Sequence, residues 1–159
     1  MLDQSPDVCV SDPKEPHFFS NEYERGFARY QSIFYDLSKA LIEASTTYSV
    51  IRPKETHPAY RGKGVGLSPE VIKRMKDASP DARIIYLLRH PVDRTYSSFL
   101  HRMRFHTGKV SLQNYFDADP MMEIGSRYSA QIERYQDEFP DSQILCLRAE
   151  DLYRDPLVF

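Results

Sequence analysis

The alternation of apolar and polar positions predicts a chain built from both strands and helices. The apolar run at 83–88 contains β-branched and aromatic residues and is too short for a core helix, so it predicts a buried strand. A turn follows, and 91–103 carries apolar residues at helical spacing, with Pro91 in the first helical position and Asp93 in the first turn. A strand that leads directly into a helix is where α/β proteins bind phosphate, at the carboxyl ends of parallel strands.

Strand-like and helix-like spacing of apolar residues predicts further elements on both sides of this central strand and helix. In chain order they predict helices at 21–34, 69–77, 112–116 and 126–138 and a strand at 143–147. The stretch 39–44 fits either a continuation of the first helix or a strand. Residues 1–13 are polar and interrupted by prolines, and they predict no element.

Charge is unevenly distributed along a chain whose formal net charge is only −2. The segment 83–109 holds six lysines and arginines against one acid, Asp93. This pattern favours an anionic ligand held locally over a nucleic-acid groove, and we expect no nucleic-acid partner. A length of 159 residues suits one domain with a real core.

The two cysteines and the apolar runs exclude several protein classes. Cys9 and Cys146 are too few for a disulfide framework or a zinc site, so we expect no metal, and Cys146 fits a core thiol. No apolar run approaches the length of a membrane span, and no signal peptide opens the chain. We therefore expect a soluble protein.

The string R-H-P-V-D-R-T-Y-S-S-F at 89–99 resembles the 3′-phosphate-binding segment of sulfotransferases that use 3′-phosphoadenosine 5′-phosphosulfate. The resemblance implies that Arg89 and Ser97 hold the 3′-phosphate of this co-substrate. A guanidinium grips a phosphate through two bonds, and a hydroxyl adds one more without adding charge. Outside such a string, both residue types are usually solvated surface. Arg94 fits a helix-surface charge better than a ligand contact.

A second string, K-E-P-H-F-F at 14–19, resembles the sulfotransferase branch that includes the heparan sulfate enzymes and related bacterial ones. The resemblance implies that Glu15 takes the proton from the acceptor hydroxyl. His17 would orient or stabilise this carboxylate, and Lys14 would contact the sulfuryl group or the acceptor. By itself, a lysine and glutamate near a histidine would indicate only an exposed loop.

Three further strings complete the resemblance. E-A-S-T-T-Y at 43–48 is similar to a family segment that follows a strand and lines the acceptor cleft, which favours the strand at 39–44. Some glycosaminoglycan enzymes have a lysine where this chain has Ala44, which weakens a heparan-type assignment. The last two strings, G-x-x-Y and E-D-L, end near 156, and Glu150 is expected to be a structural hydrogen-bonding residue. The glycine-rich 61–66 matches neither the Walker sequence nor the dinucleotide fingerprint, and we expect a surface or acceptor-side loop there.

The resemblance implies a three-layer, P-loop-like α/β fold with a mostly parallel sheet, present here as one partial domain over 1–159. Family members begin with a strand and a K-x-G-T-[ST] loop around the 5′-phosphosulfate and extend past E-D-L, and neither part occurs in this sequence. We therefore expect the chain by itself to bind the nucleotide weakly. The implied reaction moves a sulfuryl group to a hydroxyl or amine, on a carbohydrate or another small-molecule acceptor.

Two alternatives stay open. The chain could be an inactive sulfotransferase-like remnant that serves as a binding or interaction protein. Relationship to P-loop kinases is a weaker alternative, because the sequence has no Walker string. The compartment depends on the source: cytoplasm for a bacterial protein, Golgi lumen for a eukaryotic full-length enzyme.

Overall fold

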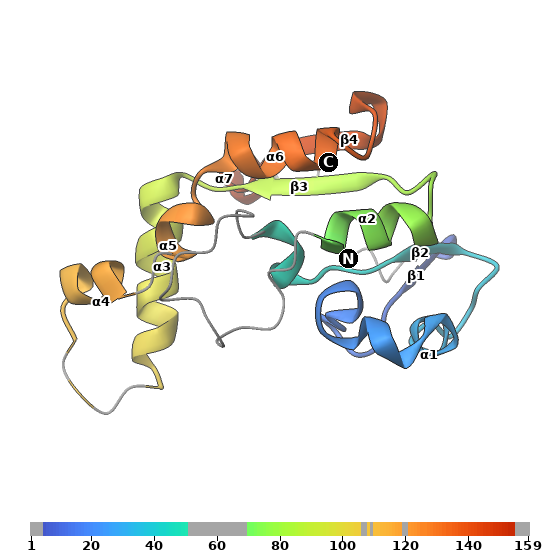
Figure 1. The fold of residues 1–159 in the computed structure, drawn as a ribbon, viewed down its shortest axis with the longest axis horizontal. Coiled ribbons are helices and arrows are strands. Elements are labelled where there is room, and N and C mark those ends of the chain that lie inside the picture. The colour runs from blue at the N-terminus through green and yellow to red at the C-terminus, as the bar shows by residue number, and fades with distance from the viewer. Residues whose placement is uncertain (1–4, 51–69, 106–107, 109, 119–120, 155–159) are drawn as a thin grey trace. The chain divides into compact units, whose positions relative to one another are not determined.

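The computed structural model describes residues 5–50, 70–105, 108, 110–118 and 121–154. The chain divides into two compact units, Met1–Met75 and Lys76–Phe159 (Figure 1). Each unit contains parallel strands and helices, so the predicted α/β class is confirmed. A single domain over the whole chain stays a prediction.

The first unit is organised around two short parallel strands. Strand β1 (Val8–Val10) pairs with β2 (Ala40–Ile42) so that Cys9 lies opposite Leu41. The helical elements of this unit are the π-helix η2 (Phe18–Glu22), the 3₁₀-helices η3 (Tyr23–Arg25) and η4 (Thr46–Ser49), α1 (Phe27–Gln31) and most of α2 (Glu70–Ala78).

Three expectations for this unit can be compared with the structure. The strand at 39–44 is confirmed as β2, but residues 1–13 contain β1, so the expectation of no element there was wrong. The single helix predicted at 21–34 was also wrong. The chain instead forms η2, η3 and α1, with a break at Gly26, whose φ of 80° lies outside the helical region.

Of the four aromatic residues whose spacing predicted this helix, Phe34 is buried, Tyr23 and Tyr30 are half-buried, and Phe27 is exposed. Cys9 is fully buried, and it packs with Ile33, Phe34 and the half-buried Tyr30. Aromatic periodicity therefore located the core only in part, and it could not show that a glycine divides the helix.

The second unit is built on β3 (Ile84–Leu88) and β4 (Ile144–Arg148), which pair in parallel with Tyr86 opposite Cys146. Strand β3 runs into α3 (Pro91–Met103), as the sequence predicted. The other helical elements among its described residues are α4 (Leu112–Ala118), α5 (Met121–Ile124), α6 (Tyr128–Gln136), the 3₁₀-helix η6 (Asp141–Gln143) and α7 (Ala149–Arg154).

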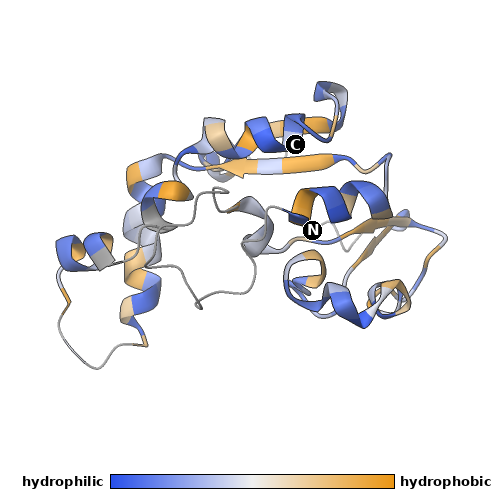
Figure 2. Ribbon diagram, in the orientation of Figure 1, coloured by the Kyte–Doolittle hydropathy of each residue, from blue (hydrophilic) through white to orange (hydrophobic). Residues whose placement is uncertain are grey.

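Only one face of this sheet is covered within the described residues. The Tyr86 ring is buried and meets the rings of Tyr128 and Tyr135 on α6, at 6.3 and 5.8 Å between centroids. Ile85 and Leu87 are 59% and 54% exposed, although Figure 2 shows hydrophobic colour along most of β3. The prediction of a fully buried strand was wrong for this face, because an apolar run does not reveal how many faces have neighbours.

The prediction of a core position for Cys146 was also wrong. Cys146 is exposed, because it lies on β4, one strand of a two-stranded sheet. The apolar face predicted for α3 is also largely exposed: Val92 and Tyr96 line an open cavity of about 590 Å³ together with Phe116. None of the described helices combines the length and apolar character that crossing a membrane requires.

Candidate functional site

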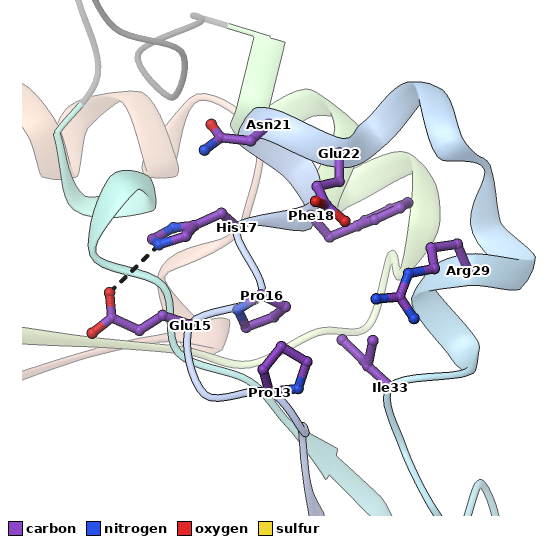
Figure 3. A pocket seen from close by; sticks show the side chains of 9 residues that line it. All are labelled: Pro13, Glu15, Pro16, His17, Phe18, Asn21, Glu22, Arg29 and Ile33. Atoms are coloured by element: carbon purple, nitrogen blue, oxygen red, sulfur yellow. Dashed lines mark ion pairs between the residues drawn. The ribbon is translucent and has the colours of Figure 1, made fainter.

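Glu15 and His17 form a close pair on the turn that precedes η2 (Figure 3). Their Oε2 and Nε2 atoms are 3.7 Å apart, and the two side chains keep 35% and 30% of their surface exposed. A carboxylate and an imidazole that are partly shielded but reachable from solvent suit proton transfer to or from a bound molecule. The structure therefore brings together two of the three predicted catalytic residues.

Hydroxyl groups from the segment after β2 hold this pair in place. Thr46 Oγ1 donates a hydrogen bond to Glu15 Oε2 at 2.9 Å, and Thr47 Oγ1 lies 2.9 Å from His17 Nδ1. The His17 backbone N–H donates to Ser45 Oγ at 2.9 Å. The E-A-S-T-T-Y string thus contributes to the site by orienting both ionisable side chains.

The backbone of the turn is strained at the same two positions. Glu15 and His17 have φ angles of 54° and 52°, in the left-handed region that non-glycine residues seldom adopt. They are the non-glycine residues with positive φ in the part of the chain that the structure describes. Each such residue costs about 1–3 kcal/mol, and such strain is concentrated at functional sites.

A cluster of aromatic rings anchors the turn that carries Glu15 and His17. Phe18 and Phe19 are almost fully buried, and their ring centroids lie 4.7 and 5.0 Å from that of Tyr30. Arg74 on α2 donates a hydrogen bond to the Phe19 carbonyl at 3.1 Å and lies over the Tyr23 ring at 4.4 Å. Packing on this scale can stabilise a strained turn.

A cavity of about 250 Å³ adjoins the pair. Its lining consists of Pro13, Glu15, Pro16, His17, Phe18, Asn21, Glu22, Arg29 and Ile33. The third predicted catalytic residue, Lys14, is exposed and does not belong to this lining. A catalytic role for Lys14 stays a prediction without support from its position.

Sequence reasoning did not single out the most unusual carboxylate of the first unit. Glu43 follows β2 directly, and both of its carboxylate oxygens are buried without a hydrogen-bond partner among the described residues. Burial raises the pKa of Glu43 to about 7, and the nearby Tyr48 hydroxyl opposes this shift. An acid next to an apolar strand was the signal that could have identified it.

The second candidate site lies where β3 meets α3. Arg89 is exposed, and its backbone N–H donates to the Tyr128 hydroxyl at 3.3 Å. The next backbone N–H, that of His90, donates to Glu150 Oε1 at 2.7 Å and holds the pKa of Glu150 below its ordinary value, with Arg89 adding a smaller effect. The predicted hydrogen-bonding role of Glu150 is confirmed.

Ser97 is half-buried on α3, the helix that begins two residues after Arg89. Whether the two side chains bind one phosphate stays a prediction. Glu15 belongs to the first unit and Arg89 to the second, so a common pocket for these residues also stays a prediction.

The Arg94 side chain has a more specific place than a surface charge. It is half-buried, and its guanidinium donates a hydrogen bond to Ser126 Oγ at 3.2 Å. The guanidinium also occupies the space that a Cβ atom at Gly125 would need. This contact explains the glycine of the G-x-x-Y string, whose tyrosine, Tyr128, supports Arg89.

Two further expectations from the sequence concern the glycine-rich string and a metal. Residues 61–66 lie outside the described residues. Within the described ranges, no three histidine, cysteine or acidic side chains are grouped so that they could hold a metal ion.

Comparison with known proteins supports the resemblance to sulfotransferases that the strings at 14–19 and 89–99 indicated. Residues 67–158, more than half of the chain, match the model of the family described as "Sulfotransferase family". A crystal structure of a sulfotransferase from Alicyclobacillus acidocaldarius superposes with a TM-score of 0.76 at 28% identity, over 98% of this chain and 68% of that one.

Two curated relatives are also similar over most of the chain. The heparan sulfate glucosamine 3-O-sulfotransferase 6 of Homo sapiens is 27% identical over 150 residues, and the Mus musculus protein of the same name is 25% identical. Each alignment covers 89% of this chain and 40% of the relative, so the chain spans less than half the length of these proteins.

Proposed function

Because the chain belongs to the sulfotransferase family, we propose that it acts in transfer of a sulfuryl group from 3′-phosphoadenosine 5′-phosphosulfate to an acceptor hydroxyl or amine. A carbohydrate is the proposed acceptor, since both curated relatives are named for a glucosamine of heparan sulfate. Ala44, where some glycosaminoglycan enzymes have a lysine, favours a less anionic carbohydrate. No metal takes part in the proposed reaction.

Glu15 is the proposed general base. Its carboxylate takes the proton of the acceptor hydroxyl while the acceptor oxygen bonds to sulfur, and the bond from sulfur to the phosphate oxygen of the donor breaks with its electrons leaving on that oxygen. Thr46 fixes one carboxylate oxygen and His17 lies 3.7 Å away, so the carboxylate has a defined orientation. Positioning contributes most to transfers of this kind.

Arg89 and Ser97 are the proposed contacts for the 3′-phosphate of the donor. The residues fit this group: the guanidinium is exposed, and the backbone on both sides of the β3–α3 junction is held by Tyr128 and Glu150. On a fixed backbone, only the side-chain torsions of the arginine lose freedom when its guanidinium binds a dianion.

One observation carries the proposal most directly. Glu15, the predicted base, lies beside His17 on a strained turn that borders a cavity, and three hydroxyl-bearing side chains of the E-A-S-T-T-Y string fix the pair. Two strings that the resemblance identified separately thus meet in one site.

Nucleotide titration tests the donor site. We expect the full-length protein to bind adenosine 3′,5′-bisphosphate more tightly than adenosine 5′-phosphate by isothermal titration calorimetry. Arg89→Ala should remove most of this preference, by about tenfold or more, because a charged hydrogen-bonded pair is lost. Arg104→Ala, an exposed arginine just after the end of α3, is the matched control and should keep the preference. Equal affinity for the two nucleotides in the unsubstituted protein would refute the proposed donor site.

A further inference from the structure

We propose that Arg94 is a positioning residue for the 3′-phosphate site and that it fixes the separation of Arg89 and Ser97. The inference rests on the proposed function, because it concerns the two residues proposed to hold the 3′-phosphate of the donor. In this role the Arg94 guanidinium binds protein and not phosphate. It fastens α3 to the loop between α5 and α6, and this loop leads into the helix that supports Arg89.

The Arg94 guanidinium fits closely against this loop. It donates a hydrogen bond to Ser126 Oγ at 3.2 Å, and a Cβ atom at Gly125 would lie only 2.7 Å from its Cζ atom. Thr95, the next residue of α3, places its own hydroxyl oxygen 3.3 Å from the same serine oxygen. Two neighbouring side chains of α3 thus contact one residue of the loop, and α5, which precedes the loop, packs against α3 (Figure 1).

Each side of this connection carries part of the proposed site. Ser97 lies on α3, about one helical turn after Arg94. Tyr128 is the first residue of α6 and follows Ser126 by two positions, and its hydroxyl accepts the Arg89 backbone N–H at 3.3 Å. Two side chains that bind one phosphate must keep their separation to within about 0.5 Å. The contacts of Arg94 join the helix that carries Ser97 to the helix that supports Arg89.

A purely structural role for Arg94 predicts a different result. Arg94 is half-buried, so its loss could simply loosen the unit. General loosening would weaken the binding of every nucleotide alike, whereas loss of positioning weakens only the binding that depends on the 3′-phosphate. The ratio of the affinities for nucleotides with and without this phosphate therefore distinguishes the two roles.

Calorimetric titration of the full-length protein with adenosine 3′,5′-bisphosphate and adenosine 5′-phosphate measures this ratio. We expect Arg94→Ala to lower the preference for the bisphosphate about threefold, less than Arg89→Ala does, because a supporting hydrogen bond is lost and not a ligand contact. Arg94→Lys should lower it to a similar degree, since an ammonium group keeps the charge but not the planar contact over Gly125. Arg104→Ala, near the other end of α3, is again the matched control.

Gly125→Ala perturbs the same contact from the other side. The added Cβ would displace the Arg94 guanidinium, because the end of a long side chain moves more easily than backbone. We expect the preference for the bisphosphate to fall as in Arg94→Ala, and to fall no further when both substitutions are combined, since no guanidinium then remains to be displaced. Gly108→Ala, where a Cβ would meet no atom within 4 Å, is the matched control.

Amide hydrogen exchange tests the support of Arg89 without any nucleotide. In Arg94→Ala and in Gly125→Ala, the Arg89 amide should exchange about threefold faster, because the Tyr128 hydroxyl that accepts it is less well placed. The neighbouring His90 amide donates to Glu150 on α7 and should keep its rate. Equal acceleration at both amides would indicate general loosening and would contradict the positioning role.

The double variant Arg89→Ala/Arg94→Ala separates positioning from direct contact with the phosphate. Loss of Arg94 should cost little more once Arg89 is absent, and a full additional loss would overturn the positioning role. If Arg94→Ala does not fold, Gly125→Ala and its control decide, and an unchanged preference there would overturn the inference. Failure of the proposed function is distinguishable, because the unsubstituted protein would then bind the two nucleotides equally.

Discussion

The turn at Glu15–His17 and the junction at Arg89–His90 position their side chains in opposite ways. The turn uses left-handed backbone that side-chain hydroxyl groups and buried rings stabilise. The junction uses an ordinary strand followed by an ordinary helix, and its backbone N–H groups are bound by Tyr128 and Glu150. A strained local conformation supports the one site, and regular secondary structure supports the other.

The difference shows where each site is vulnerable. The turn depends on several contacts from residues 28 to 31 positions away, so a change in the E-A-S-T-T-Y segment should disturb Glu15. The conformation of the junction follows from its secondary structure, and each supporting hydrogen bond contributes only part of its stability. We therefore expect large effects from substitutions in the turn and small ones at the junction.

The largest effect is expected from Glu15→Gln. Loss of a general base should lower kcat for sulfuryl transfer by about 10²–10⁴-fold. The affinity for adenosine 3′,5′-bisphosphate should stay unchanged in calorimetry, because Glu15 is not a nucleotide contact. Glu22→Gln removes another carboxylate that lines the same cavity and should leave kcat near that of the unsubstituted protein. Equal losses in both variants would mean that the cavity needs negative charge rather than a base.

An intermediate effect is expected on stability, from Glu43→Gln. The pKa of Glu43 rises from 4.5 to about 7 on folding, so its ionisation opposes folding: the cost is complete above pH 7 and disappears as the pH falls towards 4.5. The full shift corresponds to about 3 kcal/mol. Glutamine, which stays neutral, should therefore raise Tm by roughly 6–12 °C at pH 8 and by progressively less at lower pH.

Calorimetric unfolding of the variant and of Glu24→Gln between pH 5 and 8 would measure this difference. Glu24→Gln should follow the unsubstituted protein closely, because its carboxylate is 93% exposed and its ion pair with Arg74, at 3.9 Å, is weak in solvent. A gain in Tm that is the same at every pH would show that burial of Glu43 is not the cause.

The smallest effect is expected at the junction, from Glu150→Gln. The amide oxygen of glutamine still accepts the His90 N–H but without charge, so affinity for adenosine 3′,5′-bisphosphate should fall only about threefold. The pKa of Glu150 is lowered on folding, so its stabilising contribution is present above the ordinary pKa and is lost in acid as the carboxylate is protonated. The His90 amide shift should report this loss. A tenfold or greater drop in affinity would show that the junction depends on Glu150 as strongly as the turn depends on its hydroxyl groups.

Regular elements were predictable from the sequence, and their surroundings were not. Strand β3 and helix α3 followed from periodicity and from Pro91, because short-range patterns determine these elements. The exposure of Ile85 and Cys146 could not be predicted, because burial depends on which elements pack against a strand. The helix predicted at 21–34 is interrupted at Gly26, which has a φ of 80°. The sequence shows that a glycine is present, but its conformation depends on the fold.

The candidate sites show the same contrast between what local sequence patterns predict and what the fold determines. The resemblance identified Glu15, His17, Arg89 and Ser97 by residue type and spacing. The Thr46 and Thr47 contacts come from a segment some thirty residues away, and periodicity carries no information about such pairings. Glu43 went unnoticed because its importance lies in what surrounds it, and a single acid beside an apolar run is common.

The left-handed backbone at Glu15 and His17 limits how this protein can be engineered for heat resistance. Glycine is the usual replacement where φ is positive, and it would relax the turn. At these two positions it would also delete the proposed base and the imidazole beside it, so a gain in thermostability is expected to cost activity in the proposed reaction. Stabilising substitutions that leave the proposed site intact therefore belong elsewhere in the chain.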